Sequence, residues 1–184
     1  MFDGLLHSHR RKKARRGLAG RRIRSVLFLC DGNAFRSPYA AAALRRALGS
    51  SQLAASIRIQ SAGFFAPGRP APEAAVSVAR SRGIDLSSHV STLVTPSAVS
   101  GVDLVAVMSE DQARSIVPNR KPGVSLLVLG DLDPLPIDTR TIADPIGSDS
   151  RTIARVFSRI DRCVEQLATL ITHMPARARS GRQN

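Results

Sequence analysis

The chain has 184 residues, of which 43% are apolar, so it is long enough for one domain with a buried core. It contains no run of eighteen apolar residues, which argues against a membrane-spanning helix. Its two cysteines, Cys30 and Cys163, are too few for a disulfide framework, and no CxxC or HExxH pattern is present. We therefore expect no metal site and no cofactor.

The net charge of +13 is concentrated at the two ends of the chain. Residues 1–24 hold nine Lys or Arg and one Asp, residues 177–184 hold three Arg and no acid, and residues 25–176 are nearly neutral. We predict one domain over residues 25–173. It would follow a flexible basic N-terminal extension, residues 1–24, and precede a basic C-terminal tail, residues 174–184.

The basic extension could bind nucleic acid or an anionic membrane by charge alone. No aromatic residues alternate with its basic residues, as they would in a protein that binds single strands. Arg21, Arg22 and Arg24 interrupt any apolar stretch after the first basic cluster, so the segment does not read as a secretory signal. We favour a solvated extension of a cytoplasmic protein, and we expect a monomer or a weak homodimer.

Short apolar runs alternate with helix-forming segments along the predicted domain. Four runs are predicted to be strands, at residues 25–30, 56–61, 103–108 and 124–129. Four segments are predicted to be helices, at residues 37–48, 72–82, 110–116 and 152–171. This alternation predicts an α/β fold, a single three-layer domain with a central four-stranded parallel sheet and helices on both faces.

The first predicted strand ends in the sequence CDGNAFRSP, which predicts a phosphate-binding loop before a helix. Gly32 and Asn33 tolerate unusual backbone dihedrals, so the loop can turn its N–H groups toward an anion. Arg36 adds a planar fork that matches two phosphate oxygens, and the Ser37 hydroxyl can donate to a thiolate at Cys30, the nucleophilic form. We expect the phosphate to be bound by the loop residues Asp31, Gly32, Asn33, Ala34, Phe35, Arg36 and Ser37.

A thiolate that attacks phosphorus needs a general acid across the pocket. The best candidate is Asp144, in the sequence IADPI, because the loop over residues 131–150 follows the fourth strand and can reach the carboxyl edge of the sheet. Asp144 would protonate the leaving oxygen and then deprotonate the water that hydrolyses the thiophosphate intermediate. Four other carboxylates of this loop read as solvated residues, with one of them left open as an alternative acid: Asp131, Asp133, Asp138 and Asp149.

The order strand, C-x-G-N-x-x-R-S-P, helix, followed by Asp-Pro before the last helix, resembles the low-molecular-weight protein tyrosine phosphatases of bacterial type. Four further stretches match that family in order, and the resemblance covers about residues 25–172: residues 61–63, 68–72, 83–89 and 103–108. A bare C-x5-R pattern would be weak, but the Gly, Asn, Ser and Pro in register make this motif specific.

The resemblance implies a role for each matching residue. Cys30 would form a phosphocysteine intermediate, Arg36 would bind the phosphate and the transition state, and Asp144 would act as general acid and base. The loop would be supported from behind by polar side chains, Asn33, Ser37, Ser61 and His89. The resemblance also implies a tyrosine-phosphorylated protein as substrate, inorganic phosphate or vanadate as inhibitors, and no metal.

Several residues depart from the family pattern. Phe35 stands where the family usually has a second cysteine that protects the nucleophile by a reversible disulfide, so that protection should be absent. Ile146 stands where an aromatic would sandwich a phosphotyrosine ring, a wall that Phe64 and Phe65 could replace in part. Ala34 is neither the bulky aliphatic of the tyrosine-directed enzymes nor the threonine of the arginine-phosphate branch.

Asp31 is a further departure, because an acid beside the nucleophile disfavours the thiolate and repels phosphate unless its side chain points outward to solvent. Two alternative functions therefore remain beside the protein tyrosine phosphatase. One is a catalytically weak phosphate-binding module of the same fold, weakened by Asp31, Phe35 and Ile146. The other is a phosphatase for another phosphate ester or for phosphoarginine.

Overall fold

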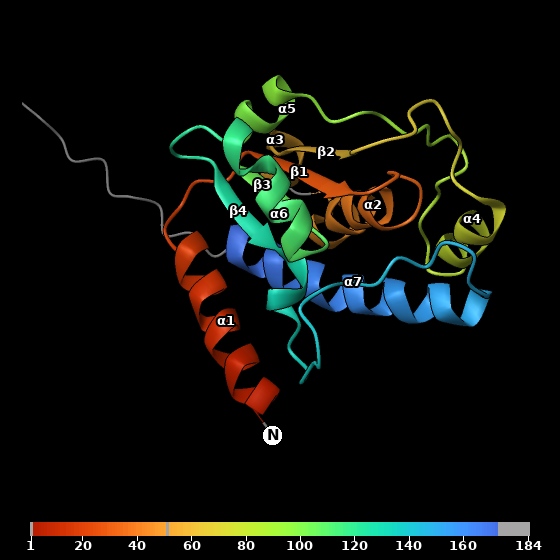
Figure 1. Ribbon diagram of the computed structural model, residues 1–184. Coiled ribbons are helices and arrows are strands. Elements are labelled where there is room, and N and C mark those ends of the chain that lie inside the picture. Colours follow the sequence, from red (N-terminus) through yellow and green to blue (C-terminus); the bar gives the residue numbers. More distant parts are fainter. Residues whose placement is uncertain (1, 51, 173–184) are drawn as a thin grey trace, which may run out of the picture.

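Four parallel strands form the centre of the structure, a computed structural model that describes residues 2–50 and 52–172. They lie in the order β2-β1-β3-β4 (Figure 1) and are β1 (Ser25–Cys30), β2 (Arg58–Gly63), β3 (Leu104–Val107) and β4 (Ser125–Val128). Each neighbouring pair is parallel. The four predicted strands are confirmed, although β2 begins at Arg58 rather than at residue 56, because Gln52–Ser56 form the short helix α3.

The four helices predicted from the sequence are present: α2 (Arg36–Leu48), α4 (Glu73–Arg80), α6 (Glu110–Ile116) and α7 (Ser150–Thr172). The sequence did not predict five further elements: α1 (Phe2–Leu18), α3, α5 (Pro96–Ser100) and the 3-10 turns η1 (Val117–Asn119) and η2 (Leu129–Leu132). All of these except α1 are too short to show a helical period in the sequence.

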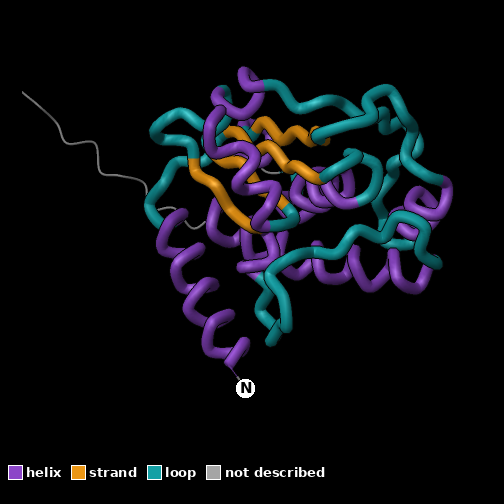
Figure 2. Tube along the Cα trace, viewed as in Figure 1, coloured by secondary structure: helices purple, strands orange, loops and turns teal. Residues whose placement is uncertain are grey.

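The side chains of β1 alternate between the two faces of the sheet. Val26 and Phe28 belong to an apolar cluster that contains residues of α2 and α7. Leu27 and Leu29 belong to a second cluster that contains residues of α5 and α6. The sheet therefore lies between two helical layers (Figure 2), and the predicted three-layer α/β fold is confirmed.

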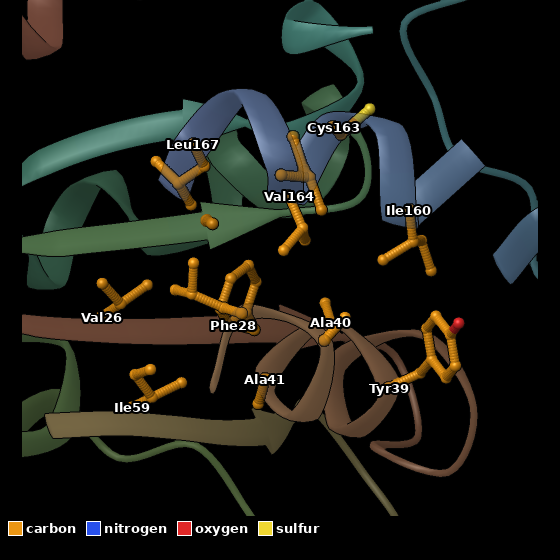
Figure 3. Packing of buried hydrophobic residues seen from close by; sticks show 14 of the residues in the cluster. Val26, Phe28, Tyr39, Ala40, Ala41, Ile59, Ile160, Cys163, Val164 and Leu167 are labelled. Carbon is orange, nitrogen blue, oxygen red and sulfur yellow. The ribbon is translucent and has the colours of Figure 1, made fainter. Parts of the chain in front are cut away.

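The larger cluster joins β1 to α2 and α7, and Figure 3 shows its side chains facing one another across this contact. The ring of Tyr39 stacks on Phe157 with the ring centroids 3.8 Å apart. The Tyr39 hydroxyl donates to both carboxylate oxygens of Asp161 at 2.9 Å. Burial raises the pKa of Tyr39, and the Asp161 carboxylate raises it further. These contacts hold α2 in place, and with it the loop that precedes α2.

The N-terminal segment differs from the flexible extension that we expected over residues 1–24. Phe2–Leu18 form helix α1, which lies against η2 (Figure 1). Nε2 of the buried His7 donates to the backbone oxygen of Asp133 at 2.9 Å, and Leu18 is buried in the core. The segment is therefore fastened to the domain over most of its length.

The basic composition of the segment did not indicate that one face of α1 contacts the rest of the domain. Arg11 and Arg15 each donate to Oε1 of Gln166 on α7 at 3.0 Å. Because His7, Arg11 and Arg15 are four residues apart, they share one face of the helix, which a count of basic residues does not reveal.

The predicted basic tail, residues 174–184, lies outside the described residues. In the part of the chain that is described, no helix is long and apolar enough to cross a bilayer.

Candidate active site

The predicted phosphate-binding loop connects the carboxyl end of β1 to the N-terminus of α2. Asn33 has a φ of 50°, in the left-handed region that asparagine tolerates better than most residues. The loop runs so close to β2 that a side chain at Gly63 would place its Cβ 2.6 Å from the backbone oxygen of Asp31. The amide of Phe64 donates to the same oxygen at 2.7 Å. The loop is therefore held tightly at this edge of the sheet.

The N-terminus of α2 points to an anion site. Over residues 2–50 and 52–172, no side chain caps this helix end, where Phe35 is the N-cap residue. The first N–H groups of a helix have no partner within the helix, and the helix dipole adds positive potential there. An anion bound at this end would satisfy these donors.

Cys30 ends β1 with its side chain buried, and its Sγ lies 3.0 Å from Oγ of Ser37. That oxygen accepts a hydrogen bond from Nδ2 of Asn33 at 2.8 Å, so one of its lone pairs is occupied. The competing acceptor for the Ser37 proton, the backbone oxygen of Ala62, is farther away, at 3.3 Å. The Ser37 hydroxyl is thus placed to donate to a thiolate at Cys30.

Asn33 is the centre of the support behind the loop. Its Nδ2 donates to Oγ of Ser61 at 3.0 Å as well as to Ser37, and its Oδ1 accepts from the amide of Thr92 at 2.9 Å. Nε2 of His89 donates to the backbone oxygen of Asn33 at 2.7 Å. The structure therefore brings together all four predicted support residues, and it adds the backbone of Thr92, which no sequence signal identified.

Arg36 is the first residue of α2, and only 3% of its side chain is exposed. Its Nη1 donates to the backbone oxygen of Ile142 at 3.0 Å. Its Nη2 donates to Oδ2 of Asp31 at 2.8 Å and also to Oδ2 of Asp144. Among the buried side-chain atoms of the described residues, Nε of Arg36 is one of the few without a hydrogen-bond partner.

The long loop between η2 and α7 brings Asp144 to Arg36, the arginine of the phosphate-binding loop. The amide of Ile142 donates to the backbone oxygen of Met108, directly after β3, at 2.8 Å. The amide of Ile146 donates to Oδ1 of Asp144 at 3.3 Å, which orients that carboxylate. About a third of the Asp144 side chain remains exposed, so it can meet both the buried arginine and a ligand from solvent.

The alternative acids considered from the sequence have other surroundings. Asp131 and Asp133 are buried, and each pairs with arginine. Asp149 accepts a hydrogen bond from a backbone amide in the first turn of α7, and this bond lowers the pKa of Asp149. Asp138 is exposed. Of the five carboxylates, Asp144 is the one bonded to the arginine of the phosphate-binding loop.

Two exposed apolar side chains flank this region. Phe65 is 57% exposed, and its ring lies next to Gly32, where an added Cβ would be 3.9 Å from Cε2 of Phe65. Ile146 follows the Asp-Pro pair and is 74% exposed. Phe64, by contrast, packs against the smaller core cluster. Phe65 therefore remains the candidate for an aromatic wall.

Gln112 on α6 is a buried side chain that the sequence analysis missed. Its Nε2 donates to Oδ1 of Asp31 at 3.0 Å, and its Oε1 accepts from the amide of Met108 at 2.8 Å. The sequence does contain a local signal, because Ser109 and Gln112 have the spacing of a capping box, and Ser109 accepts from the Gln112 amide at 3.2 Å. Nothing in that signal indicates the contact with Asp31.

Cys163 on α7 has surroundings unlike those of Cys30. It is buried, and burial raises the pKa of its thiol to about 12, with the carboxylate of Asp133 adding to the effect. Such a thiol stays protonated near neutral pH and is a poor nucleophile.

In residues 2–50 and 52–172, no group of three or more His, Cys, Asp or Glu side chains is placed to hold a metal ion.

The chain matches known phosphatases in sequence and in structure. The family model of "Low molecular weight phosphotyrosine protein phosphatase" matches residues 25–177. The "Probable low molecular weight protein-tyrosine-phosphatase EpsP" of Ralstonia solanacearum is 40% identical over 119 residues, which are 63% of this chain and 77% of that protein.

Two solved structures share the fold. The tyrosine phosphatase Wzb from Escherichia coli K30, in complex with sulphate, superimposes with a TM-score of 0.69 and 27% identity, over 80% of this chain and 97% of that one. The YwlE arginine phosphatase from Geobacillus stearothermophilus superimposes with a TM-score of 0.66 and 26% identity, over 79% and 90% of the two chains.

Fold, loop and comparisons together define the class, an enzyme of the protein-tyrosine-phosphatase type. Within that class, the chain belongs to the low molecular weight phosphotyrosine protein phosphatase family, as the sequence resemblance implied. Helix α1 precedes the matched residues and is an addition to the part that the family model covers.

Proposed function

We propose that the chain hydrolyses phosphotyrosine monoesters in proteins through a phosphocysteine intermediate on Cys30, with Asp144 as general acid and base. The observation that carries this proposal is the contact between Arg36 and Asp144, because it joins a carboxylate from a distant loop to the loop that holds the thiol. Membership of the family supports the same assignment. We further propose that residues 25–173 form the catalytic domain.

Binding of the phosphoryl group would use donors that have no side-chain cap or hydrogen-bond partner within the described residues. The N-terminus of α2 offers backbone N–H groups, and Nε of Arg36 is a buried donor without an acceptor. A buried donor left unpaired is unfavourable by about 1–3 kcal/mol, so an anion that pairs with it gains affinity. Three equatorial phosphoryl oxygens would meet these donors, while phosphorus faces Sγ of Cys30.

The reaction would then proceed in two steps. In the first, the Cys30 thiolate forms an S–P bond while the P–O bond to the leaving group breaks, and protonated Asp144 gives its proton to the leaving oxygen. In the second, the Asp144 carboxylate takes a proton from water as that water attacks phosphorus, and the S–P bond breaks to return the thiolate and inorganic phosphate. The Ser37 hydroxyl, 3.0 Å from Sγ, would stabilise the thiolate in both steps.

The exposed ring of Phe65 beside Gly32 favours an aromatic leaving group, because it offers a face on which a tyrosine ring can stack. We therefore propose a tyrosine-phosphorylated protein in the cytoplasm as the partner, with inorganic phosphate and vanadate as competitive inhibitors. A phosphoarginine phosphatase is the second candidate activity. The structural likeness to an arginine phosphatase supports it, and Ala34 matches neither the tyrosine-directed nor the arginine-phosphate branch.

The proposal is tested by the turnover of p-nitrophenyl phosphate and of phosphotyrosine, phosphoserine and phosphoarginine peptides. We expect the phosphotyrosine peptide to have the highest kcat/KM among the peptides. Cys30→Ser should reduce kcat by about 10⁴-fold or more while phosphate still binds, since the loop donors remain.

Cys163→Ser is the matched control for that variant, because Cys163 is buried far along α7 and its thiol is protonated. It should turn over substrate at the rate of the unmodified chain. Substantial activity in Cys30→Ser would overturn the proposed mechanism. Phosphate binding without any turnover by the unmodified chain would instead favour the phosphate-binding module.

A further inference from the structure

The carboxylate of Asp31, beside the nucleophile, does not point away into solvent. Its Oδ2 accepts from Nη2 of Arg36 at 2.8 Å, and its Oδ1 accepts from Nε2 of Gln112 at 3.0 Å. The side chain is 40% exposed, so it lies at the border between the loop and solvent. A carboxylate in this position reduces the positive potential that attracts phosphate to the site.

Gln112 holds this carboxylate in place. Gln112 is only 5% exposed, and the amide of Met108 donates to its Oε1 at 2.8 Å. Since the Met108 amide is a donor, it fixes which end of the side-chain amide is oxygen, and Nε2 must then face Asp31. Asp31 is therefore oriented by a buried partner from α6 rather than by solvent.

The contact with Asp31 occupies the donor that a phosphoryl group would use. Arg36 binds phosphate best through two adjacent N–H groups of its planar fork. Its Nε is without a partner, whereas its Nη2 donates to both Asp31 and Asp144. A phosphoryl dianion that enters the site must therefore compete with carboxylates for Nη2.

The two carboxylates, Asp31 and Asp144, differ in whether they lose their negative charge when the ester binds. In the proposed mechanism Asp144 carries a proton when the ester binds, so its negative charge is absent at that step. Asp31 has no such role, and Gln112 keeps its carboxylate beside Arg36. Its charge therefore faces the phosphate throughout the cycle.

We propose that Asp31 is a built-in competitor of the phosphoryl group, a positioning residue that accepts a hydrogen bond from Nη2 of Arg36 and weakens the binding of phosphate dianions. This inference rests on the proposed function, because it concerns the same site. It predicts that the product, inorganic phosphate, inhibits weakly, because Asp31 forms its hydrogen bond to Arg36 again as the product leaves. Asp31 thus acts on phosphate affinity and product release rather than on bond breaking.

The test compares Asp31→Asn and Asp31→Leu with the unmodified chain. The measurements are the inhibition constants of phosphate and vanadate, and KM and kcat for p-nitrophenyl phosphate. Because a charge-assisted hydrogen bond at a half-exposed position is replaced, we expect both inhibition constants and KM to fall about tenfold, with kcat unchanged or lower. A merely structural role would instead raise KM or lower the thermal stability, and thermal unfolding is recorded for each variant.

Asp111→Asn is the matched control, since Asp111 is an 89% exposed carboxylate on α6 that pairs with Arg114. Like Asp31→Asn, this variant removes one negative charge. The charge lies on α6, the helix of Gln112, and the phosphate-binding loop is left as it is, so all four constants should stay unchanged. An equal fall in this control would mean that the net charge of the protein, not Asp31, sets the affinity, and the inference would be wrong.

Three further outcomes are decisive. Unchanged or higher inhibition constants in both Asp31 variants would overturn the inference. A loss of kcat/KM for phosphoarginine peptides alone would also overturn it, because Asp31 would then bind a substrate guanidinium rather than compete for Arg36. If the unmodified chain has no turnover but Asp31→Asn binds phosphate more tightly by calorimetry, the inference stands and the proposed catalysis fails.

Discussion

Two arginine–carboxylate clusters in this molecule are built from the same residue types but differ in how far their carboxylates are exposed to solvent. Around Asp133, which is 0% exposed, Arg162 donates through Nε and Nη2 at 2.9 Å each, and Arg159 lies 3.3 Å away. Around Arg36, the partners Asp31 and Asp144 remain 40% and 32% exposed. One cluster is closed to solvent at its carboxylate, and the other is open.

Exposure of the carboxylate separates a structural ion pair from a binding site. The Asp133 carboxylate also accepts from the amide of Leu135 at 3.2 Å, so its lone pairs are well used within the chain. Arg36, in contrast, shares Nη2 between two partly exposed carboxylates from different loops. A cluster whose carboxylates are partly exposed and can be exchanged for another anion is suited to bind a ligand.

The two cysteines follow the same division. Cys163 lies within the influence of Asp133, and its thiol pKa is raised by burial. Cys30 lies next to the Ser37 hydroxyl, at the N-terminus of α2. Burial, with Asp133 adding to it, thus keeps the Cys163 thiol protonated, whereas the Ser37 hydroxyl is placed to donate to Cys30.

The largest effect that would sharpen this comparison is expected from Asp144→Asn. This variant keeps a polar side chain near Arg36 but removes the proton that the leaving group needs, so kcat should fall about 10²–10⁴-fold. The loss should be larger for phenyl phosphate than for p-nitrophenyl phosphate, because the better leaving group depends less on an acid. Steady-state kinetics with both esters measures this, and an equal loss for both would contradict the acid role.

A change in the closed cluster should affect stability instead of rate. Asp133→Asn leaves Arg159 and Arg162 partly buried beside a neutral side chain, so the free energy of unfolding should fall by about 3–5 kcal/mol. Urea denaturation measures this, with the exposed Asp138→Asn as the control that should change nothing. If kcat of the folded Asp133 variant fell as it does in Asp144→Asn, the separation of the two clusters would break down.

The smallest effect is expected at the contact between α1 and the closed cluster. His7→Ala removes the hydrogen bond to the backbone oxygen of Asp133 and should lower the free energy of unfolding by about 1 kcal/mol, with no change in turnover. His9→Ala, at an exposed position of the same helix, is the control. Identical unfolding curves for both variants would show that α1 contributes nothing through His7.

The strands and the position of the phosphate-binding loop could be predicted because their signals are local. The apolar run of β1 and the Gly, Asn, Arg and Ser of the following loop are contiguous, so pattern and chemistry could be read together. Asp144 could be placed because a parallel sheet brings its strand ends, and the loops after them, to one edge. Ser61 and His89 came only from the family resemblance, and the structure bonds both to Asn33.

The parts that the sequence did not predict depend on contacts between distant segments. Gln112 and Asp31 are 81 residues apart, and neither residue type indicates the other. Helix α1 was hidden by its charge, because His7, Arg11 and Arg15 on its contact face make polar contacts, and of its described side chains only Ala14 and Leu18 near its end pack against the apolar core. Polar contacts leave no periodic signal of the kind that identified α7.

The central claim is that Cys30 carries the phosphoryl group during turnover. Its most direct test is rapid acid quenching of the reaction with p-nitrophenyl phosphate, followed by peptide mass spectrometry of both cysteines. We predict a phosphorylated peptide that contains Cys30, with more of it in Asp144→Asn, where hydrolysis of the intermediate is slowed, and no phosphate on Cys163. Continued turnover with no phosphate on Cys30 at any quench time would contradict the account.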